Sequence, residues 1–326
     1  MKYRQHKACG FAAVVLAFGL AAHACLCSAQ AYPQRPVRII VNVTPGGGVD
    51  SVARIAAQHY SSVWNQPFVV DNRTGAGGSI GVELVVKAAS DGYTLLVCSS
   101  GVVTNAAVRP QNYDPVRDLQ GVTVLTAAPY MVLTTPSLPV SSVKELVALA
   151  KAKPNGVSFA SAGTGSIIHM GAELLVFLSG TTMLHVPYKG VADAYPAVAS
   201  GDVNWMLGAP VSALPLVRAG RLKAIAVTSA ARSKLLPDLP TVAESGLKGY
   251  DVRGWFGMFA PAGTSREIVD RLQSEAKRAF DTPEVTRRMK VEGTDVVINT
   301  PAEFAGEVRA ELDRWRTLVK KTGVKF

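Results

Sequence analysis

Charged residues, cysteines and histidines are all scarce in this sequence, and each scarcity excludes a class of protein. Of the 326 residues, 18% are charged and 48% are hydrophobic. So apolar a chain can bury sizeable cores, which excludes a disordered chain and a miniature scaffold. The 29 glycines and 19 prolines exclude a coiled coil or a fibrous repeat and are typical of turn-rich α/β domains. At roughly 150 residues per domain, the length predicts two domains.

A hydrophobic run stands at the N-terminus. Three basic residues precede an apolar stretch over residues 8–26, and Ala29-Gln30-Ala31 has the small-x-small pattern that a signal peptidase needs. The stretch is about as long as a membrane-spanning helix, but His23 and two cysteines interrupt it. We therefore interpret residues 1–31 as a secretory signal peptide, cleaved after Ala31, rather than as a membrane anchor.

Cleavage there leaves one cysteine, Cys98, and three histidines. A disulfide then has no partner within the chain, and because Cys98 ends an apolar run we interpret it as a buried strand residue. His59, His169 and His185 lack the spacing of metal ligands, so neither a metal nor another cofactor is predicted. The formal charge falls from +10 to +7, and the basic residues are scattered, so no nucleic-acid partner is predicted.

Short apolar runs alternate with helical patterns along most of the mature chain, which predicts parallel or mixed sheets covered by helices. Capping boxes at residues 142–145, 264–267 and 300–303 each predict a helix start. We expect the last two helices to pack back on the first sheet. The predicted strands cover residues 37–43, 68–71, 94–98, 122–125, 130–135, 157–160, 183–186, 203–207 and 223–228, with a crossing segment at 249–254.

Three glycine-rich loops each join a predicted strand to a predicted helix, at residues 44–50, 72–81 and 161–166. Glycine lets the backbone approach a ligand closely, and the first N–H groups of the following helix are unpaired and lie at the positive end of its dipole. Loops at the carboxyl ends of strands meet at one edge of an open α/β sheet. The three loops therefore predict a cleft for an anion, with simple tight turns as the alternative.

Nucleotide-binding signatures are missing from these loops. No loop ends in Gly-Lys-Ser/Thr, and Ile80 stands where a dinucleotide fingerprint needs glycine. Residues 77–81 do match the Gly-x-Ser-x-Gly nucleophile elbow, which leaves open a secreted serine hydrolase that uses Ser79 with His169 or His185 as its base. Such an elbow follows its strand directly, whereas four residues intervene here. We therefore predict that the protein is not an enzyme.

Several polar and aromatic residues near the loops have two interpretations each. Tyr188 and Lys189 follow a predicted strand and either close over an acidic ligand or pack and remain solvated. Asp50 stabilises the dipole of the first helix or contacts a ligand. His169 is expected to face its own helix or the core, and Phe256 is expected to pack, with a cleft wall as the alternative.

Taken together, the motifs resemble one family, the Bug-type (TctC-like) extracytoplasmic solute receptors of tripartite tricarboxylate transporters. The resemblance extends over nearly the whole mature chain, and although each motif is weak alone, their order is specific. The motifs lie at residues 32–36, 45–50, 53–54, 72–78, 91–96, 163–169, 185–190, 236–244 and 260–264.

The resemblance implies a two-domain Venus flytrap of the type II periplasmic-binding-protein kind, with mixed sheets flanked by helices, two crossing segments and a ligand between the domains. Domain I would comprise residues 32–131 and 251–326, and domain II residues 132–250. The ligand contacts that the family implies are Val43, Thr44, Gly46, Gly47, Asp50, Ser99, Ser100, Gly101, Ala162, Gly163, Thr164, Gly165, Ser166, His169, Tyr188, Lys189, Gly190, Gly208 and Ala209.

The implied role is that of a monomeric periplasmic receptor. It would capture a small organic carboxylate by domain closure and deliver it to the permease subunits of the transporter. A sensor that passes the signal to a membrane partner would bind the same ligand and is the alternative. We expect the backbone N–H groups of Gly46, Gly47 and Gly165 to dominate the affinity. Val43 and Thr44 depart from the family, which commonly has phenylalanine and proline there, so one wall loses an aromatic ring and gains a hydroxyl.

Overall fold

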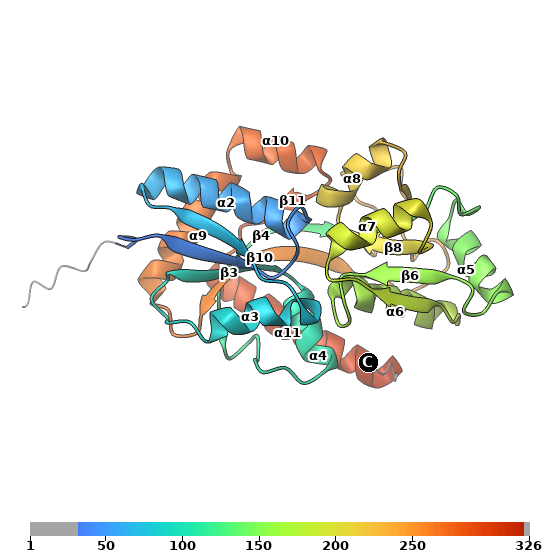
Figure 1. Ribbon diagram of the computed structural model, residues 1–326, viewed down its shortest axis with the longest axis horizontal. Helices are drawn as coiled ribbons and strands as arrows, with labels where there is room; N and C mark the ends of the chain where they lie inside the picture. Colours follow the sequence, from blue (N-terminus) through green and yellow to red (C-terminus); the bar gives the residue numbers. More distant parts are fainter. Residues whose placement is uncertain (1–31, 323–326) are drawn as a thin grey trace, which may run out of the picture. The chain divides into compact units, whose positions relative to one another are not determined.

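The computed structural model describes residues 32–322, with side chains through residue 320 (Figure 1). The predicted signal peptide and its cleavage site lie outside these residues. From Arg35 onward the described chain forms one compact unit that contains two β-sheets. Within residues 32–322, no helix combines the length and the apolarity that crossing a bilayer requires.

The first sheet has six strands in the order β11-β4-β10-β3-β1-β2. Strand β1 pairs in parallel with β2 and β3, which places Ile39 opposite both Val70 and Leu95. Strand β10 comes from far along the chain and runs antiparallel to β3 and β4. The strands are β1 (Val37–Val41), β2 (Phe68–Asn72), β3 (Thr94–Ser99), β4 (Leu119–Pro129), β10 (Arg253–Pro261) and β11 (Asp295–Val296).

The second sheet has five strands in the order β7-β6-β8-β5-β9. Strand β6 is parallel to β7 and β8, whereas β5 is antiparallel to β8 and β9. Both sheets are thus mixed, as predicted. The strands are β5 (Met131–Thr134), β6 (Ser158–Ser161), β7 (Leu184–Pro187), β8 (Trp205–Gly208) and β9 (Lys223–Val227).

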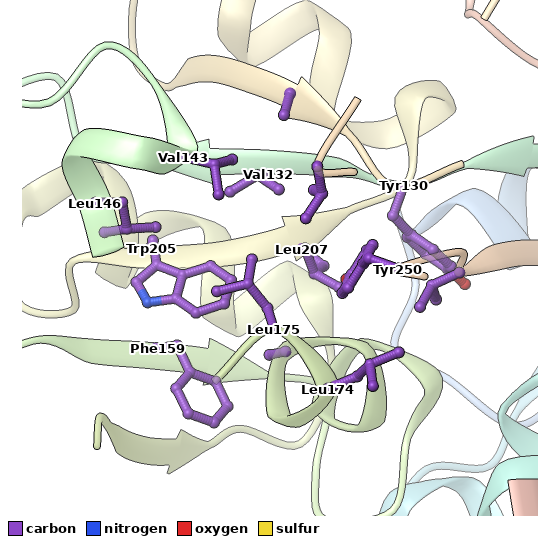
Figure 2. Close-up of a cluster of buried hydrophobic side chains, with 14 of the residues drawn as sticks. Tyr130, Val132, Val143, Leu146, Phe159, Leu174, Leu175, Trp205, Leu207 and Tyr250 are labelled. Atoms are coloured by element: carbon purple, nitrogen blue, oxygen red, sulfur yellow. The ribbon is translucent and has the colours of Figure 1, made fainter. Parts of the chain in front are cut away.

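Helices cover both faces of the second sheet, as Figure 1 shows for α6 and α7. Successive residues of a strand point to opposite faces. Accordingly, Phe159 and Trp205 join a buried cluster with residues of α6 (Figure 2), whereas Ala160 and Met206 join another cluster with residues of α7 and α8. The helices are α2 (Gly48–Trp64), the 3-10 turn η1 (Ala76–Gly78), α3 (Ser79–Val86), α4 (Gly101–Val108), α5 (Val143–Ala152), α6 (Ile167–Ser179), α7 (Val191–Ser200), α8 (Pro210–Arg218), α9 (Arg266–Phe280), α10 (Pro283–Val291) and α11 (Pro301–Thr322).

Two of the three predicted N-cap residues, Ser142 and Thr300, cap their helices, although Glu145 reaches back to Ser141 N–H rather than to Ser142. The Ser142 hydroxyl accepts the N–H of Glu145 ahead of α5, and the Thr300 hydroxyl accepts the N–H of Glu303 ahead of α11. The third prediction is wrong by one residue, because the Thr264 hydroxyl donates to Pro261 O (2.7 Å) and Ser265 caps α9 instead. The prediction for Cys98 is confirmed: it lies fully buried in β3, and burial raises the pKa of its thiol.

Two segments cross between the sheets, and hydrogen bonds join them. Strand β4 continues through Tyr130 into β5, and the chain returns from β9 to β10 through residues 228–252. Thr228 N–H donates to Tyr130 O (2.9 Å), Tyr130 N–H donates to the Thr228 hydroxyl (2.7 Å), and Val252 N–H donates to Thr228 O (2.8 Å). Hydrogen bonds therefore fix the two connections between the sheets to each other.

Candidate ligand-binding site

A cavity of about 50 Å³, counted as space for the centre of a water molecule, lies where loops from the two sheets meet. The residues that line it are Asn42, Val43, Gly47, Gly48, Val49, Gly77, Gly78, Ser99, Gly101, Tyr130, Ala162, Ser166, Ile167, Ile168, Lys189, Val191, Tyr195, Ala209, Ser212 and Phe256.

Helix N-termini surround this cavity. Helices α2, α4, α6, α7 and α8 begin at or beside lining residues, and each follows the carboxyl end of a strand. The first N–H groups of a helix have no partner within it, and they carry the positive end of the helix dipole. Helix starts at the cavity wall favour a negative group there with little need for charged side chains.

The loop between β1 and α2 is held from inside by Asp50. This buried carboxylate accepts hydrogen bonds from Gly46 N–H (3.0 Å), Arg54 Nε (3.0 Å) and Asn72 Nδ2 (3.0 Å). Burial opposes ionisation, but the Arg54 guanidinium and the two other donors outweigh it and lower the pKa of Asp50 below its ordinary value. Asp50 therefore remains ionised and shapes the loop, and it is not among the lining residues.

The loop between β6 and α6 is held by two stacked histidines. Gly165 N–H donates to His169 Nδ1 (3.0 Å), so this nitrogen is unprotonated. The His169 ring stacks on His185 with centroids 3.9 Å apart, and His185 Nε2 pairs with the Ser161 hydroxyl (2.7 Å). Burial and the neighbouring His169 lower the pKa of His185 to about 4. The His185 ring is therefore neutral at pH 7, and both rings pack beside the glycine loop.

Loops from the two sheets touch each other around the cavity. The Thr104 hydroxyl of α4 donates to Gly165 O (2.9 Å), and a Cβ built on Gly163 would lie 3.2 Å from the Cα of Gly77. The Thr44 side chain, in turn, lies directly against Gly190. Loops that follow strands of both sheets therefore meet at the cavity, and each sheet contributes part of its wall.

Two serines on the cavity wall accept helix amides and, within the described residues, donate their hydroxyl hydrogens to no protein acceptor. Ser99 Oγ accepts the N–H of Gly101 (3.3 Å), and Ser166 Oγ accepts the N–H of His169 (3.3 Å). A hydroxyl whose lone pair accepts from a helix amide still has its own O–H to donate. A Cβ built on Gly101 would lie 3.0 Å from Ser99 Oγ and 3.9 Å from the Cα of Ser166, so the two serines are neighbours.

The predicted site residues divide into two groups. The predicted residues that line the cavity are Val43, Gly47, Ser99, Gly101, Ala162, Ser166, Lys189 and Ala209. The other predicted residues do not line the cavity but lie in the same loops or at strand or helix ends beside it. These are Thr44, Gly46, Asp50, Ser100, Gly163, Thr164, Gly165, His169, Tyr188, Gly190 and Gly208.

Two of the three amides expected to dominate the affinity already have partners. Gly46 N–H donates to Asp50 Oδ2, and Gly165 N–H donates to His169 Nδ1, so among the three only Gly47 lies on the cavity wall. The Gly46 and Gly165 amides thus have protein acceptors, and the expectation that they dominate the affinity stays a prediction. Their positive φ angles, +81° and +83°, turn each amide back toward its own loop, where a side chain accepts it.

The serine elbow has no hydrolase geometry. Ser79 is buried, and its hydroxyl donates to Gln111 Oε1 (2.6 Å) rather than to a histidine.

Some lining residues were not predicted from the sequence. Five of them adjoin predicted positions, so extending the predicted site in each loop by one or two residues would have included them. These are Asn42, Gly48, Val49, Ile167 and Ile168. Tyr195 and Ser212 lie within the first turns of α7 and α8, where nothing local marks them. Their hydroxyl oxygens are 2.8 Å apart across the wall, and burial raises the pKa of Tyr195 to about 12.

Comparison with known protein families identifies one match. A family model described as "Tripartite tricarboxylate transporter family receptor" matches residues 52–324. Among curated proteins, the chain is 35% identical over 306 residues to Protein BugT of Bordetella pertussis, which covers 92% of this chain and 93% of that protein.

Solved structures give the same result. The periplasmic binding protein BugD is similar at 34% identity with a TM-score of 0.86, covering 90% of this chain and 99% of that one. Rpa4515 of R. palustris with adipate is similar at 33% identity with a TM-score of 0.86 (90% and 99%). MatC of Rhodopseudomonas palustris with bound malate is similar at 33% identity with a TM-score of 0.85 (88% and 100%). The fold is therefore the two-domain Venus flytrap of periplasmic binding proteins.

Proposed function

Because the chain belongs to the tripartite tricarboxylate transporter receptor family, a family of solute-binding receptors rather than enzymes, we propose that it is exported to the periplasm and acts there as a monomer. It captures a small organic carboxylate between its two domains. It then delivers this ligand to the permease subunits of a tripartite tricarboxylate-type transporter. Adipate and malate in the similar structures support a carboxylate as the ligand.

The domain division proposed from the resemblance follows the division of strands between the sheets except at Met131, which begins β5 of the second sheet. All strands of the first sheet lie within residues 37–129 and 253–296, and all strands of the second lie within 131–227. We assign residues 32–131 and 251–326 to domain I and residues 132–250 to domain II. Rotation about the joined segments at Tyr130 and Thr228 then opens and closes the cavity.

The observation that carries this proposal is the convergence of helix N-termini on a cavity whose lining includes Lys189 and no acidic side chain. A carboxylate there meets the Ser99 hydroxyl from domain I and the Ser166 hydroxyl and Lys189 from domain II. Each hydrogen bond to a charged group contributes about 1.5–3 kcal/mol. Because donors come from both domains, the ligand binds the closed form more tightly and shifts the equilibrium toward closure.

A thermal-unfolding screen of the mature chain, residues 32–326, against a panel of carboxylates tests the proposal. A ligand at 100 times its Kd should raise the free energy of unfolding by about 2.7 kcal/mol. Calorimetry would then compare Lys189→Met, which we expect to bind several-fold more weakly, with Lys144→Met, an exposed lysine on α5 whose loss should not matter. If no carboxylate stabilises the protein, the proposed function is wrong.

A further inference from the structure

We propose that this cavity selects carboxylates that carry no ammonium group, so that plain acids and hydroxy acids bind whereas the corresponding amino acids are rejected. The inference rests on the proposed function, because it specifies the ligand class of the same site. It goes further because it states which substituent on the carboxylic acid the side chains of the cavity wall exclude.

The cavity wall carries positive charge and no negative charge. Lys189 is the only residue with an ionisable charge at pH 7 among those that line the cavity, and none of the lining residues is Asp or Glu. Asp50, the carboxylate in the adjoining loop, is directed instead at Arg54, Asn72 and Gly46 N–H. An ammonium group in the closed cavity would therefore have no counter-ion.

The oxygen atoms on the wall are neutral, and several are already engaged. Ser99 Oγ and Ser166 Oγ each accept a helix amide, and the Tyr195 and Ser212 hydroxyls are paired with each other. Asn42 Oδ1 has no hydrogen-bond partner in the described chain, but it is an uncharged acceptor with almost no exposed surface. A hydroxyl on the ligand needs only a neutral partner, whereas an ammonium group needs its charge compensated.

The helix dipoles also disfavour an ammonium group in the cavity. A positive group placed at the N-terminus of a helix is destabilised, and five helices begin at this cavity. Removing a charge from water without pairing it carries a large penalty. We therefore expect an amino acid to bind on the order of 100-fold more weakly than the plain or hydroxy acid with the same carbon skeleton.

Calorimetry on the mature wild-type chain measures this discrimination directly. The probes are matched sets that differ in one substituent: propionate, lactate and alanine; and succinate, malate and aspartate; together with the 2-hydroxy and 2-amino derivatives of the best acid from the carboxylate screen. An amino acid that binds at least tenfold more weakly than its plain acid supports the proposal, and a smaller ratio overturns it. If no acid binds at all, the proposed function fails and this inference fails with it.

A gain-of-function variant tests the cause. Ser212→Asp places a carboxylate on the wall in the first turn of α8, where the helix dipole favours an acid. We expect it to reduce the ratio of amino-acid Kd to plain-acid Kd at least tenfold. The matched control is Ser265→Asp, which adds the same charge at the N-cap of α9, away from the cavity, and should leave the ratio unchanged. An unchanged ratio in a folded Ser212→Asp protein would overturn the charge explanation; if this variant does not fold, the wild-type ratio alone decides.

Discussion

Glycines around the cavity allow loops of the two domains to approach more closely than any side chain would permit. Gly48 is the clearest example, because it opens α2 on the cavity wall. A Cβ built there would overlap Val211 Cγ1 of α8 and lie 2.8 Å from Phe256 Cε2. Because α8 follows a strand of the second sheet and α2 a strand of the first, the missing Cβ at position 48 allows these two elements to touch.

We predict that Gly48→Ala weakens binding of the best carboxylate about tenfold or more, since overpacking of 1–3 kcal/mol would act on the closed form. Calorimetry gives the Kd. The matched control is Gly306→Ala within α11, where a Cβ meets nothing within 4 Å. It should leave the Kd unchanged and stabilise the fold by about 0.5–1 kcal/mol, because glycine is unfavourable inside a helix. Wild-type affinity in Gly48→Ala would show that closure tolerates the methyl group.

Helix α11 links the hydrophobic clusters of both domains. Phe304, Val308 and Leu312 pack with strands of the first sheet, as expected for the C-terminal helices. Further along, Trp315 is only 2% exposed and belongs to the cluster that contains Phe159 of the second sheet. The prediction that this helix packs on the first sheet was therefore incomplete. The last turns of α11 also pack against the hydrophobic cluster of the second sheet.

Removing the Trp315 side chain should destabilise the protein by about 3–5 kcal/mol, the usual loss for a buried tryptophan replaced by alanine. Urea unfolding followed by circular dichroism measures the difference between Trp315→Ala and wild type. Arg316→Ala changes the next, exposed residue and should stay within about 0.5 kcal/mol of wild type. If Trp315→Ala lowers the free energy of unfolding by less than about 1 kcal/mol, the packing of Trp315 against the second sheet contributes little to stability.

The stability of the folded protein should depend on pH through the histidine pair. The pKa of His185 is about 4 in the folded state, against an ordinary value of 6.5. The unfolded chain therefore takes up a proton before the folded chain does, and stability falls as the pH decreases from about 6.5 to 4. Burial is the main cause, and the stacked His169 ring adds to it.

Urea unfolding at pH 7, 5.5 and 4 would show this loss, and His185→Gln should flatten it over this interval because glutamine does not titrate. The wild type and the variant should differ most in the slope between pH 6.5 and 4. An identical slope in both proteins would assign the pH dependence to other groups, such as the carboxylates that ionise near pH 4.

Amino-acid order determined the parts of this protein that depend on neighbours within a few residues. The alternation of strands and helices, the Ser142 and Thr300 caps and the glycine turns between strand and helix all follow from such local patterns. The position of the cavity followed too, because the carboxyl ends of parallel strands meet at one edge of a sheet.

The folded arrangement decided which groups face the ligand. Gly46 and Gly47 are adjacent in the chain, yet one amide is bound to Asp50 while the other residue lines the cavity. Tyr195, Ser212 and Phe256 join the wall from elements far from the glycine loops along the chain. The hydrogen-bond partners and the contacts between loops join residues that are distant in sequence. The same distant residues together form a wall that has no acidic group. No local sequence pattern contains this information.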